Sequence, residues 1–315
     1  MKRQSAGIHH ITAFAGNPQA NVDFYAGILG LRMIKRTVNF DAPEIYHLYF
    51  GNEAGSPGTA MTFFLSNDNQ RGEVGAGQVG FTTFAVPAGS LPFWEQRFAK
   101  FGIPFERSER FGETYLRFRD WDGLQLELVE RDDIPNSNWT FGGVPSEHAI
   151  KGFGGAVLFS LKPENTMVAL EELLGFERIG EDREYVRFRS LGEYGNIVDV
   201  YTGAKDRGSG GAGTIHHIAW RTRDEEEQSD WRVAVEDYGF RPTPVIDRQY
   251  FRSIYFREAG GILYEIATDG PGFTIDEPLE GLGGELVLPP QYEQMRERIE
   301  AGLEPIQVRV LEQDR

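Results

Sequence analysis

The sequence contains no cysteine. This absence excludes disulfide bonds, thiolate nucleophiles, iron–sulfur clusters and cysteine-ligated zinc, and it leaves histidine, aspartate and glutamate as the strong metal ligands. A chain without cysteine fits a reducing compartment, so we expect a cytoplasmic protein.

The sequence also lacks any long hydrophobic run. No stretch approaches the roughly eighteen apolar residues that a membrane-spanning helix requires, and the opening residues MKRQSAGIHH lack the apolar core of a secretory signal. We therefore expect no membrane association and no secretion. With 315 residues, of which 40% are hydrophobic and 25% charged, the chain can bury a core. A prior of about 150 residues per domain predicts two domains.

Basic residues are too few to favour nucleic acid as a partner. The 32 lysines and arginines stand against 48 acidic residues, which gives a formal charge of -16 and a pI near 4.9. This is the wrong sign for holding a phosphate backbone. The glycine-rich stretch GSGGAG at 208–213 lacks the lysine and the serine or threonine of a P-loop, so no nucleotide is expected either.

Four segments of the chain repeat one pattern. Each contains a helix that ends at an apolar-Gly-apolar triplet, because a residue just past the last helical turn commonly adopts the left-handed conformation that glycine favours. In the first segment we expect Asn17 to cap the helix and Pro18 to occupy its first position. The triplet glycines lie 72, 73 and 64 residues apart, at positions 30, 102, 175 and 239.

Strand-like runs complete each segment. One run follows each triplet, at 45–50, 114–119, 184–189 and 253–258. A closing strand then begins at a glycine, and four residues later stand Thr62, Glu127, Asp199 and Glu265. We therefore predict an α+β fold of four βαβββ modules, numbered 1 to 4, at about 6–66, 77–131, 151–203 and 212–269.

These modules suggest a division of the chain. We expect one pair of modules in residues 1–150, a second pair in 151–275, and a tail at 276–315 with one helix near 291–302. The glycine-rich segment 203–213 is typical of a flexible connection before the fourth module.

Two modules of this kind can join their strands into a half-open barrel, whose first and last strands point side chains into a shared cavity. The opening strands match at His10, Phe81, Ala156 and His217. If modules pair in chain order, neither cavity receives two histidines. If module 1 pairs with module 4, one cavity receives His10, His217, Glu265 and the neutral Thr62. We predict this second arrangement, which leaves modules 2 and 3 to pair with each other.

Two imidazoles and one carboxylate beside open positions form the facial triad typical of non-haem Fe(II) oxygenases, although Mn(II) or Zn(II) also fits these donors. Four of the six histidines form His-His pairs at matching places, whereas His47 and His148 stand alone and are more typical of structural residues. Glu265 lies in an apolar run, ILYEIA, where an unpaired carboxylate is costly. Alternation along a strand does not settle which histidine of each pair is the ligand.

Longer segments resemble a known family. GIHHIT at 7–12, DFYAGILGLRMIKRTVNFD at 23–41, GTIHHIAW at 213–220 and GGILYEIATD at 260–269 are similar to ring-cleaving dioxygenases of the vicinal oxygen chelate superfamily, which also contains glyoxalases and bleomycin resistance proteins. The resemblance is to the hydroquinone dioxygenase branch and covers almost the whole chain. It implies an Fe(II)-dependent enzyme that takes a small aromatic substrate, a hydroquinone or related phenol, and opens the ring with O2.

The same resemblance implies the site residues. It assigns the second histidine of each pair to the metal, so His10 and His217 are the expected ligands together with Glu265. It also implies that five residues lie around the metal or substrate: His9, Thr12, His216, Arg248 and Tyr255. Tyr255 and Tyr49 occupy matching places in modules 4 and 1, where modules 2 and 3 carry Arg117 and Arg187, and a phenol there can hydrogen-bond a bound oxygen.

Two other functions stay open. A metal-dependent isomerase or lyase of the glyoxalase kind usually has a fourth protein ligand, where this chain has Thr62. A protein that binds an aromatic compound without turnover usually lacks the metal ligands altogether. A homo-oligomer also stays open, because the sequence specifies neither the oligomeric state nor the ring substituents of the substrate.

Overall fold

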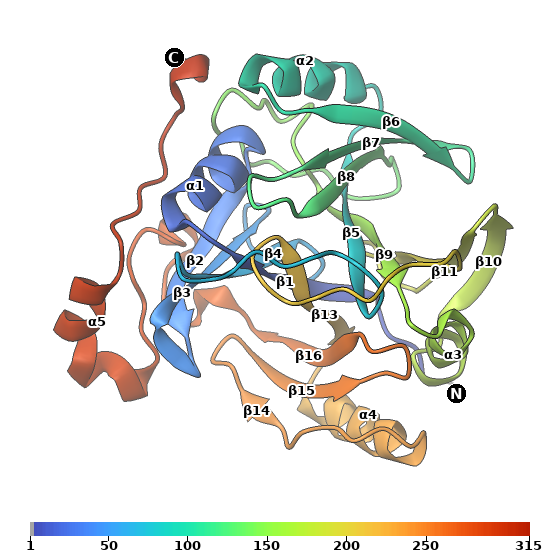
Figure 1. The fold of residues 1–315 in the computed structure, drawn as a ribbon. Coiled ribbons are helices and arrows are strands. Elements are labelled where there is room, and N and C mark those ends of the chain that lie inside the picture. The colour runs from blue at the N-terminus through green and yellow to red at the C-terminus, as the bar shows by residue number, and fades with distance from the viewer. Residues whose placement is uncertain (1–2) are drawn as a thin grey trace.

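The computed structural model describes residues 3–315, and the chain runs through the βαβββ order four times (Figure 1). Module 1 contains β1 (Ile8–Ala15), α1 (Pro18–Val22), the π-helical turn η1 (Asp23–Ile28), β2 (Arg32–Asn39), β3 (Ala42–Gly51) and β4 (Ala60–Leu65). Module 2 contains β5 (Gln78–Val86), α2 (Leu91–Phe101), β6 (Phe105–Arg110), β7 (Glu113–Arg119) and β8 (Gln125–Glu130). Module 3 contains β9 (Gly152–Phe159), α3 (Pro163–Val168), the π-helical turn η2 (Ala169–Leu173), β10 (Glu177–Asp182), β11 (Tyr185–Arg189) and β12 (Ile197–Tyr201). Module 4 contains β13 (Thr214–Thr222), α4 (Glu225–Asp237), β14 (Ile246–Asp247), β15 (Phe251–Arg257) and β16 (Leu263–Pro271).

The strands form two eight-stranded sheets, each built from two modules. The first has the order β14-β15-β16-β13-β1-β4-β3-β2, and the second has the order β10-β11-β12-β9-β5-β8-β7-β6. Module 1 therefore pairs with module 4 through β1 and β13, and module 2 pairs with module 3 through β5 and β9; both junctions are antiparallel. The predicted α+β fold and the predicted pairing of the modules are confirmed.

The ends of the repeated helices follow the sequence pattern. The Asn17 side chain accepts a hydrogen bond from the backbone N–H of Ala20, and Pro18 occupies the first turn, as expected. Gly30 has a φ of 68°, and a Cβ atom there would lie 2.8 Å from the side chain of Val144. The sequence pattern did not predict that the first and third helices end in π-helical turns; in the first, the N–H of Leu29 bonds the carbonyl of Phe24.

The tail runs from module 4 back over modules 1 and 2 (Figure 1). It contains the 3-10 turns η3 (Phe273–Ile275), η4 (Leu279–Gly281), η5 (Pro290–Met295) and η6 (Glu312–Asp314), and the helix α5 (Arg296–Gly302). The predicted tail helix is present, although its first part is a 3-10 turn. Arg309 pairs with Asp23 of module 1 at 2.6 Å, and Asp314 pairs with Arg97 of α2 at 2.8 Å.

The glycine-rich segment 203–213 differs from its prediction as a flexible connection. It lies beside residues 70–76, with backbone hydrogen bonds from Ala212 N to Gln70 O at 2.8 Å and from Ser209 N to Glu73 O at 2.9 Å. Glycine permits this close approach, because a Cβ atom at position 211 would lie 2.4 Å from the carbonyl oxygen of Gln70. The two connections between modules therefore support each other.

The register of the closing strands confirms the predicted matching of modules, with one exception. Tyr49 lies opposite Thr62 and Tyr255 opposite Glu265, while the arginines lie opposite Glu127 and Asp199. On the opening strands, however, Gly155 and not Ala156 corresponds to His217. Thr83 pairs with Gly155 as Thr12 pairs with His217.

Modules 2 and 3 fill their cavity with ion pairs. Arg110, at the end of β6, donates to Asp199 at 2.6 Å and to both oxygens of Glu127 at 2.7 and 2.9 Å. Arg117 donates to Glu127, and Arg187 donates to Asp199. These carboxylates are buried, so the charge that would otherwise require a cation is balanced by guanidinium groups of the chain itself.

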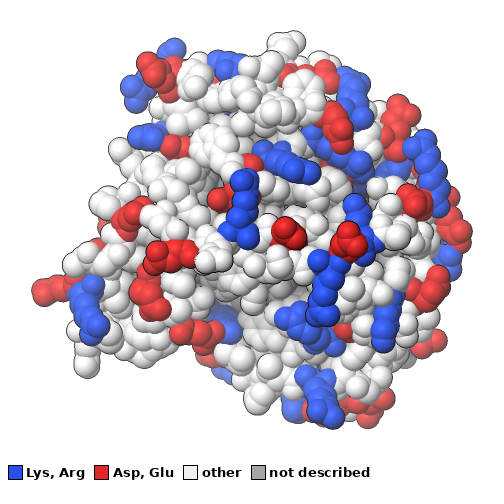
Figure 2. Space-filling model, in the orientation of Figure 1, with Lys and Arg blue, Asp and Glu red and all other residues white. Residues whose placement is uncertain are grey.

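Charged side chains of both signs share the surface. Figure 2 shows acidic and basic side chains interspersed on the visible face, with neither sign forming a continuous block. Within residues 3–315, no helix has the length and apolar character needed to traverse a bilayer.

The first prediction concerns the buried ion pairs. Arg110→Met leaves the carboxylates of Glu127 and Asp199 without their shared partner, and we expect it to lower the free energy of unfolding by about 3–5 kcal/mol. Arg107→Met is the matched control on the same strand, because Arg107 is half-exposed and pairs only with Glu95; we expect a change of at most about 1 kcal/mol. Chemical denaturation of both variants measures this, and similar losses would contradict the account.

Candidate metal centre

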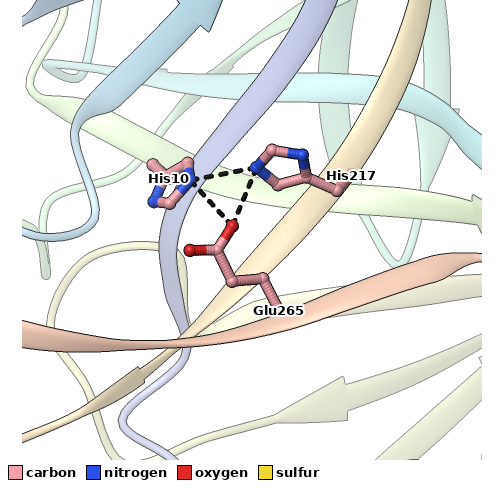
Figure 3. A group of neighbouring side chains, drawn as sticks. All are labelled: His10, His217 and Glu265. Carbon is pink, nitrogen blue, oxygen red and sulfur yellow. Dashed lines mark hydrogen bonds and ion pairs between the residues drawn. The ribbon is translucent and has the colours of Figure 1, made fainter. Parts of the chain in front are cut away.

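Three side chains from three neighbouring strands meet inside the barrel of modules 1 and 4. His10 lies on β1, His217 on β13 and Glu265 on β16, and all three are buried. The Nε2 atoms of the two histidines are 3.1 Å apart, and the Oε2 atom of Glu265 lies 2.9 Å from His217 Nε2 and 3.3 Å from His10 Nε2. Figure 3 shows the three side chains converging on one point.

The donor atoms fit a divalent metal ion. Ligand bonds of roughly 2.0–2.2 Å at near right angles place neighbouring donor atoms about 3 Å apart, as they are here. Glu265 Oε2 is buried and has no hydrogen-bond partner of acceptable geometry among the described residues. Burial alone would raise the pKa of Glu265, but His10 and His217 outweigh it and hold the pKa well below its ordinary value. The site is thus a buried His-His-Glu metal site whose carboxylate is ionised and can bind a cation.

Each ligand histidine is supported by the histidine before it in the chain. His9 Nδ1 lies 2.9 Å from His10 Nδ1, and His216 Nδ1 lies 2.7 Å from His217 Nδ1. When Nε2 binds a metal ion, the proton of the ring resides on Nδ1 and needs an acceptor. Burial lowers the pKa of His9 well below its ordinary value and that of His216 to about 3, so both rings are neutral and can accept. This geometry brings the second histidine of each pair, and not the first, into the cluster of donor atoms with Glu265.

The carboxylate ligand has its own support. Ser253, on β15, donates a hydrogen bond to Glu265 Oε1, the oxygen that points away from the histidines. In module 1 the corresponding place of Glu265 belongs to Thr62, which is neutral and buried. Its hydroxyl bonds Thr12, and Thr12 Oγ1 lies 2.9 Å from His217 Nε2. Residues 3–315 therefore supply three charged or imidazole donors to this cluster and no fourth.

Arg248 and Tyr255 lie together on the module 4 side of the cavity. Arg248 Nε donates to the Tyr255 hydroxyl at 3.2 Å, and its Nη1 pairs with Asp41 at 3.0 Å. Burial, and then the charge of Glu265, raise the pKa of Tyr255 above its ordinary value, so the phenol stays protonated. The ion pair with Asp41 connects the β14–β15 loop to the turn between β2 and β3.

The metal site opens into a cavity of about 370 Å³. Its walls are largely aromatic, and its lining includes His10, His216, His217, Arg248 and Tyr255 among the residues implied by the sequence. Thr12 and His9 lie behind this wall, in contact with the ligands.

Sequence reasoning missed several lining residues. His47, interpreted as structural, faces the cavity two residues before Tyr49 on β3, and alternation along that strand is the signal that could have found it. Asn39, at the end of β2, and Asp41, in the turn that follows, also reach the cavity, where no periodic pattern of the sequence predicts side-chain direction.

Comparison with known proteins agrees with this geometry. Residues 7–128 match the family described as "Glyoxalase/Bleomycin resistance protein/Dioxygenase superfamily". The chain is 53% identical to "Putative ring-cleaving dioxygenase MhqO" of Bacillus subtilis, over 99% of this chain and all of that protein. The chain belongs to this superfamily. The resemblance stated from the sequence is confirmed.

Two further members of the superfamily are informative. "Chlorohydroquinone/hydroquinone 1,2-dioxygenase" of Sphingobium indicum is 35% identical, over 93% of this chain and 94% of that protein. A crystal structure of a "putative dioxygenase" from Bacillus subtilis superposes with a TM-score of 0.97 and is 53% identical, over 98% of this chain and all of that one. The chain thus matches these relatives along nearly their whole length.

The second prediction separates ligands from their supports. We expect His10→Ala and His217→Ala to abolish stable metal binding, because each removes one of three donors. His9→Ala and His216→Ala remove only the acceptor for a ligand Nδ1–H, so we expect them to retain the ion with an affinity about 10–100-fold weaker. Elemental analysis after dialysis, with titration of Fe(II) into metal-free protein, measures this. Loss of the ion in the second pair of variants and its retention in the first would reverse the assignment.

Proposed function

We propose that the protein is a ring-cleaving dioxygenase that uses Fe(II), held by His10, His217 and Glu265, to open a hydroquinone-type aromatic ring with O2. The observation that carries the proposal is the buried three-donor site, open towards an aromatic-lined cavity. The full-length similarity to a hydroquinone dioxygenase supports the same reaction.

The donor set suits Fe(II). Two neutral imidazoles and one carboxylate leave a divalent ion with a net positive charge, which favours an anionic phenolic oxygen. Three donors on one side are the arrangement of non-haem Fe(II) oxygenases. The bound ion supplies the redox chemistry that dioxygen needs to react with an aromatic ring, and Mn(II) is the alternative ion that these ligands suit.

The surrounding residues then have separate tasks. His9 and His216 accept the Nδ1 protons of the ligand imidazoles and so fix the orientation of both rings. Tyr255, protonated and held by Arg248, donates a hydrogen bond to a substrate oxygen. Thr12, beside His217, supplies a hydroxyl at the metal. A cavity of about 370 Å³ has room for one substituted aromatic ring.

The third prediction tests the reaction itself. Protein loaded with Fe(II) under anaerobic conditions and then given hydroquinone and 18O2 is expected to consume one O2 per ring and to place both labelled atoms in the opened product. Glu265→Gln is the control, because it removes the charged donor at nearly constant volume, and we expect it to show no uptake. Absence of uptake with any hydroquinone or catechol would overturn the proposal and leave an isomerase, a lyase or an aromatic-binding protein.

The fourth prediction concerns Tyr255. We expect Tyr255→Phe to retain the metal and to lower kcat about 10–100-fold, because a hydrogen-bond donor to a reacting oxygen is lost. Tyr46→Phe is the matched control, since the Tyr46 hydroxyl bonds only the carbonyl of Glu304 and the side chain of Arg36, away from the metal. Steady-state kinetics with metal analysis measures both, and equal kcat values for Tyr255→Phe and the wild type would remove the role given to this phenol.

A further inference from the structure

A continuous chain of hydrogen bonds connects β3 to the metal site. The four distances are 3.0 Å from the Tyr49 hydroxyl to His47 Nδ1, 2.9 Å from His47 Nε2 to Thr62 Oγ1, 2.8 Å from Thr62 Oγ1 to Thr12 Oγ1, and 2.9 Å from Thr12 Oγ1 to His217 Nε2. Thr62 and Thr12 are buried, whereas Tyr49 and the half-buried His47 lie at the cavity wall.

The first of these hydrogen bonds, between Tyr49 and His47, fixes the tautomer of His47. Burial raises the pKa of Tyr49 well above its ordinary value, so its phenol carries a proton. Within residues 3–315 its hydroxyl bonds only His47 Nδ1. A buried hydroxyl without an acceptor is costly, so Tyr49 donates and Nδ1 accepts. Burial lowers the pKa of His47 well below its ordinary value, which leaves a neutral ring with one N–H, on Nε2.

The tautomer of His47 then sets the direction of donation in the next two hydrogen bonds. His47 Nε2–H donates to Thr62, and Thr62 uses its own proton to donate to Thr12. The hydroxyl proton of Thr12 is therefore free for another acceptor. His217 Nε2 is the neighbour in reach, but its lone pair is committed when a metal ion is bound. The proton of Thr12 is then left for an acceptor bound at the metal position, because Thr12 Oγ1 adjoins the ligand atom His217 Nε2 behind the cavity wall.

We propose that Tyr49, His47 and Thr62 are positioning residues, which direct the Thr12 hydroxyl at a hydroxyl oxygen of the aromatic substrate as negative charge develops on it. This proposal rests on the proposed function and deepens it.

The equivalent positions of modules 1 and 4 support this assignment of positioning residues. Thr62 stands where module 4 has the ligand Glu265, and His47 stands where module 4 has Ser253, two residues before the matching tyrosine. Ser253 holds Glu265 in place, and His47 bonds Thr62 in the same way. One half of the barrel thus supplies a metal ligand, and the other half supplies an oriented hydrogen-bond donor at the equivalent place.

The direction of the chain can be measured without turnover. In Zn(II)-loaded protein with 15N-labelled histidine, long-range 1H–15N NMR spectra are expected to show His47 as the Nε2–H tautomer. In Tyr49→Phe, which removes the first donor, we expect the Nδ1–H form of His47 to appear. Tyr46→Phe, on the same strand, is the control and is expected to match the wild type. A wild-type Nδ1–H tautomer would overturn the proposal, because Thr62 would then donate to His47 and not to Thr12.

The consequence for the reaction is measured with Thr62 variants loaded with Fe(II). We expect Thr62→Val to keep its metal and to lower kcat about 10–100-fold with little change in KM, because the misdirected donor acts as charge develops. Thr62→Ser restores the hydroxyl and should recover most of kcat. Thr82→Val is the matched control and should behave as the wild type, because Thr82 is buried in the other sheet and its hydroxyl has no partner among the described residues.

The outcomes separate this proposal from the proposed function. Wild-type kcat in Thr62→Val, or a Thr62→Ser variant as slow as Thr62→Val, would overturn the positioning role. If Thr62→Val does not fold, Tyr49→Phe carries the kinetic test. If the wild-type protein consumes no O2 with hydroquinone, the proposed function fails, while the tautomer of His47 still decides whether the chain has the inferred direction.

Discussion

The antiparallel pairing of β1 with β13 is the interaction on which the metal site depends. It brings His10 beside His217, 207 positions further along the chain, with Thr12 opposite His217 and His10 opposite Ala219 in the register. The parallel neighbours β4 and β16 then add Thr62 on one side and Glu265 on the other. Without this junction His10 would lie apart from His217 and Glu265, and neither module alone would supply all three donors.

The two barrels of the molecule balance the charge of their buried carboxylates with different partners. One barrel buries Glu127 and Asp199 at its closing strands and the other buries Glu265, and a buried carboxylate needs a positive partner. Modules 2 and 3 provide that partner as the guanidinium of Arg110, flanked by Arg117 and Arg187. Modules 1 and 4 have tyrosines at the places of those two arginines, and Glu265 is left with imidazoles and an unsatisfied oxygen. Glu265 therefore has imidazoles as partners where Glu127 and Asp199 have guanidinium groups.

Much of this arrangement follows from the sequence because the repeat defines equivalent positions. The spacing of glycines such as Gly30 predicts four modules, and the distribution of histidines among them predicts that modules 1 and 4 meet. The metal ligands follow from that pairing, although the choice between His9 and His10 needed either the family resemblance or the geometry. The preceding histidine of each pair lies within hydrogen-bond distance of the ligand ring, and we infer that it is the acceptor, a function that spacing alone does not reveal.

Other features depend on contacts between distant segments and leave no periodic signal. The pairing of segment 203–213 with residues 70–76 is one example, and the one-residue displacement that puts Gly155 at the place expected for Ala156 is another. Asp41 reaches the cavity from a turn, where side-chain direction follows from tertiary packing. His47 lies on a strand with a clear alternation, so its place was predictable in principle. A single histidine without a matching partner gave no reason to look for it.

The central claim is that one metal ion binds between modules 1 and 4 and none between modules 2 and 3. Anomalous X-ray diffraction at the iron absorption edge, from crystals of Fe(II)-loaded protein, tests it most directly. We predict a single anomalous peak per chain, within bonding distance of His10 Nε2, His217 Nε2 and Glu265. A peak beside Glu127 and Asp199, or one bound through His9 or His216, would contradict it.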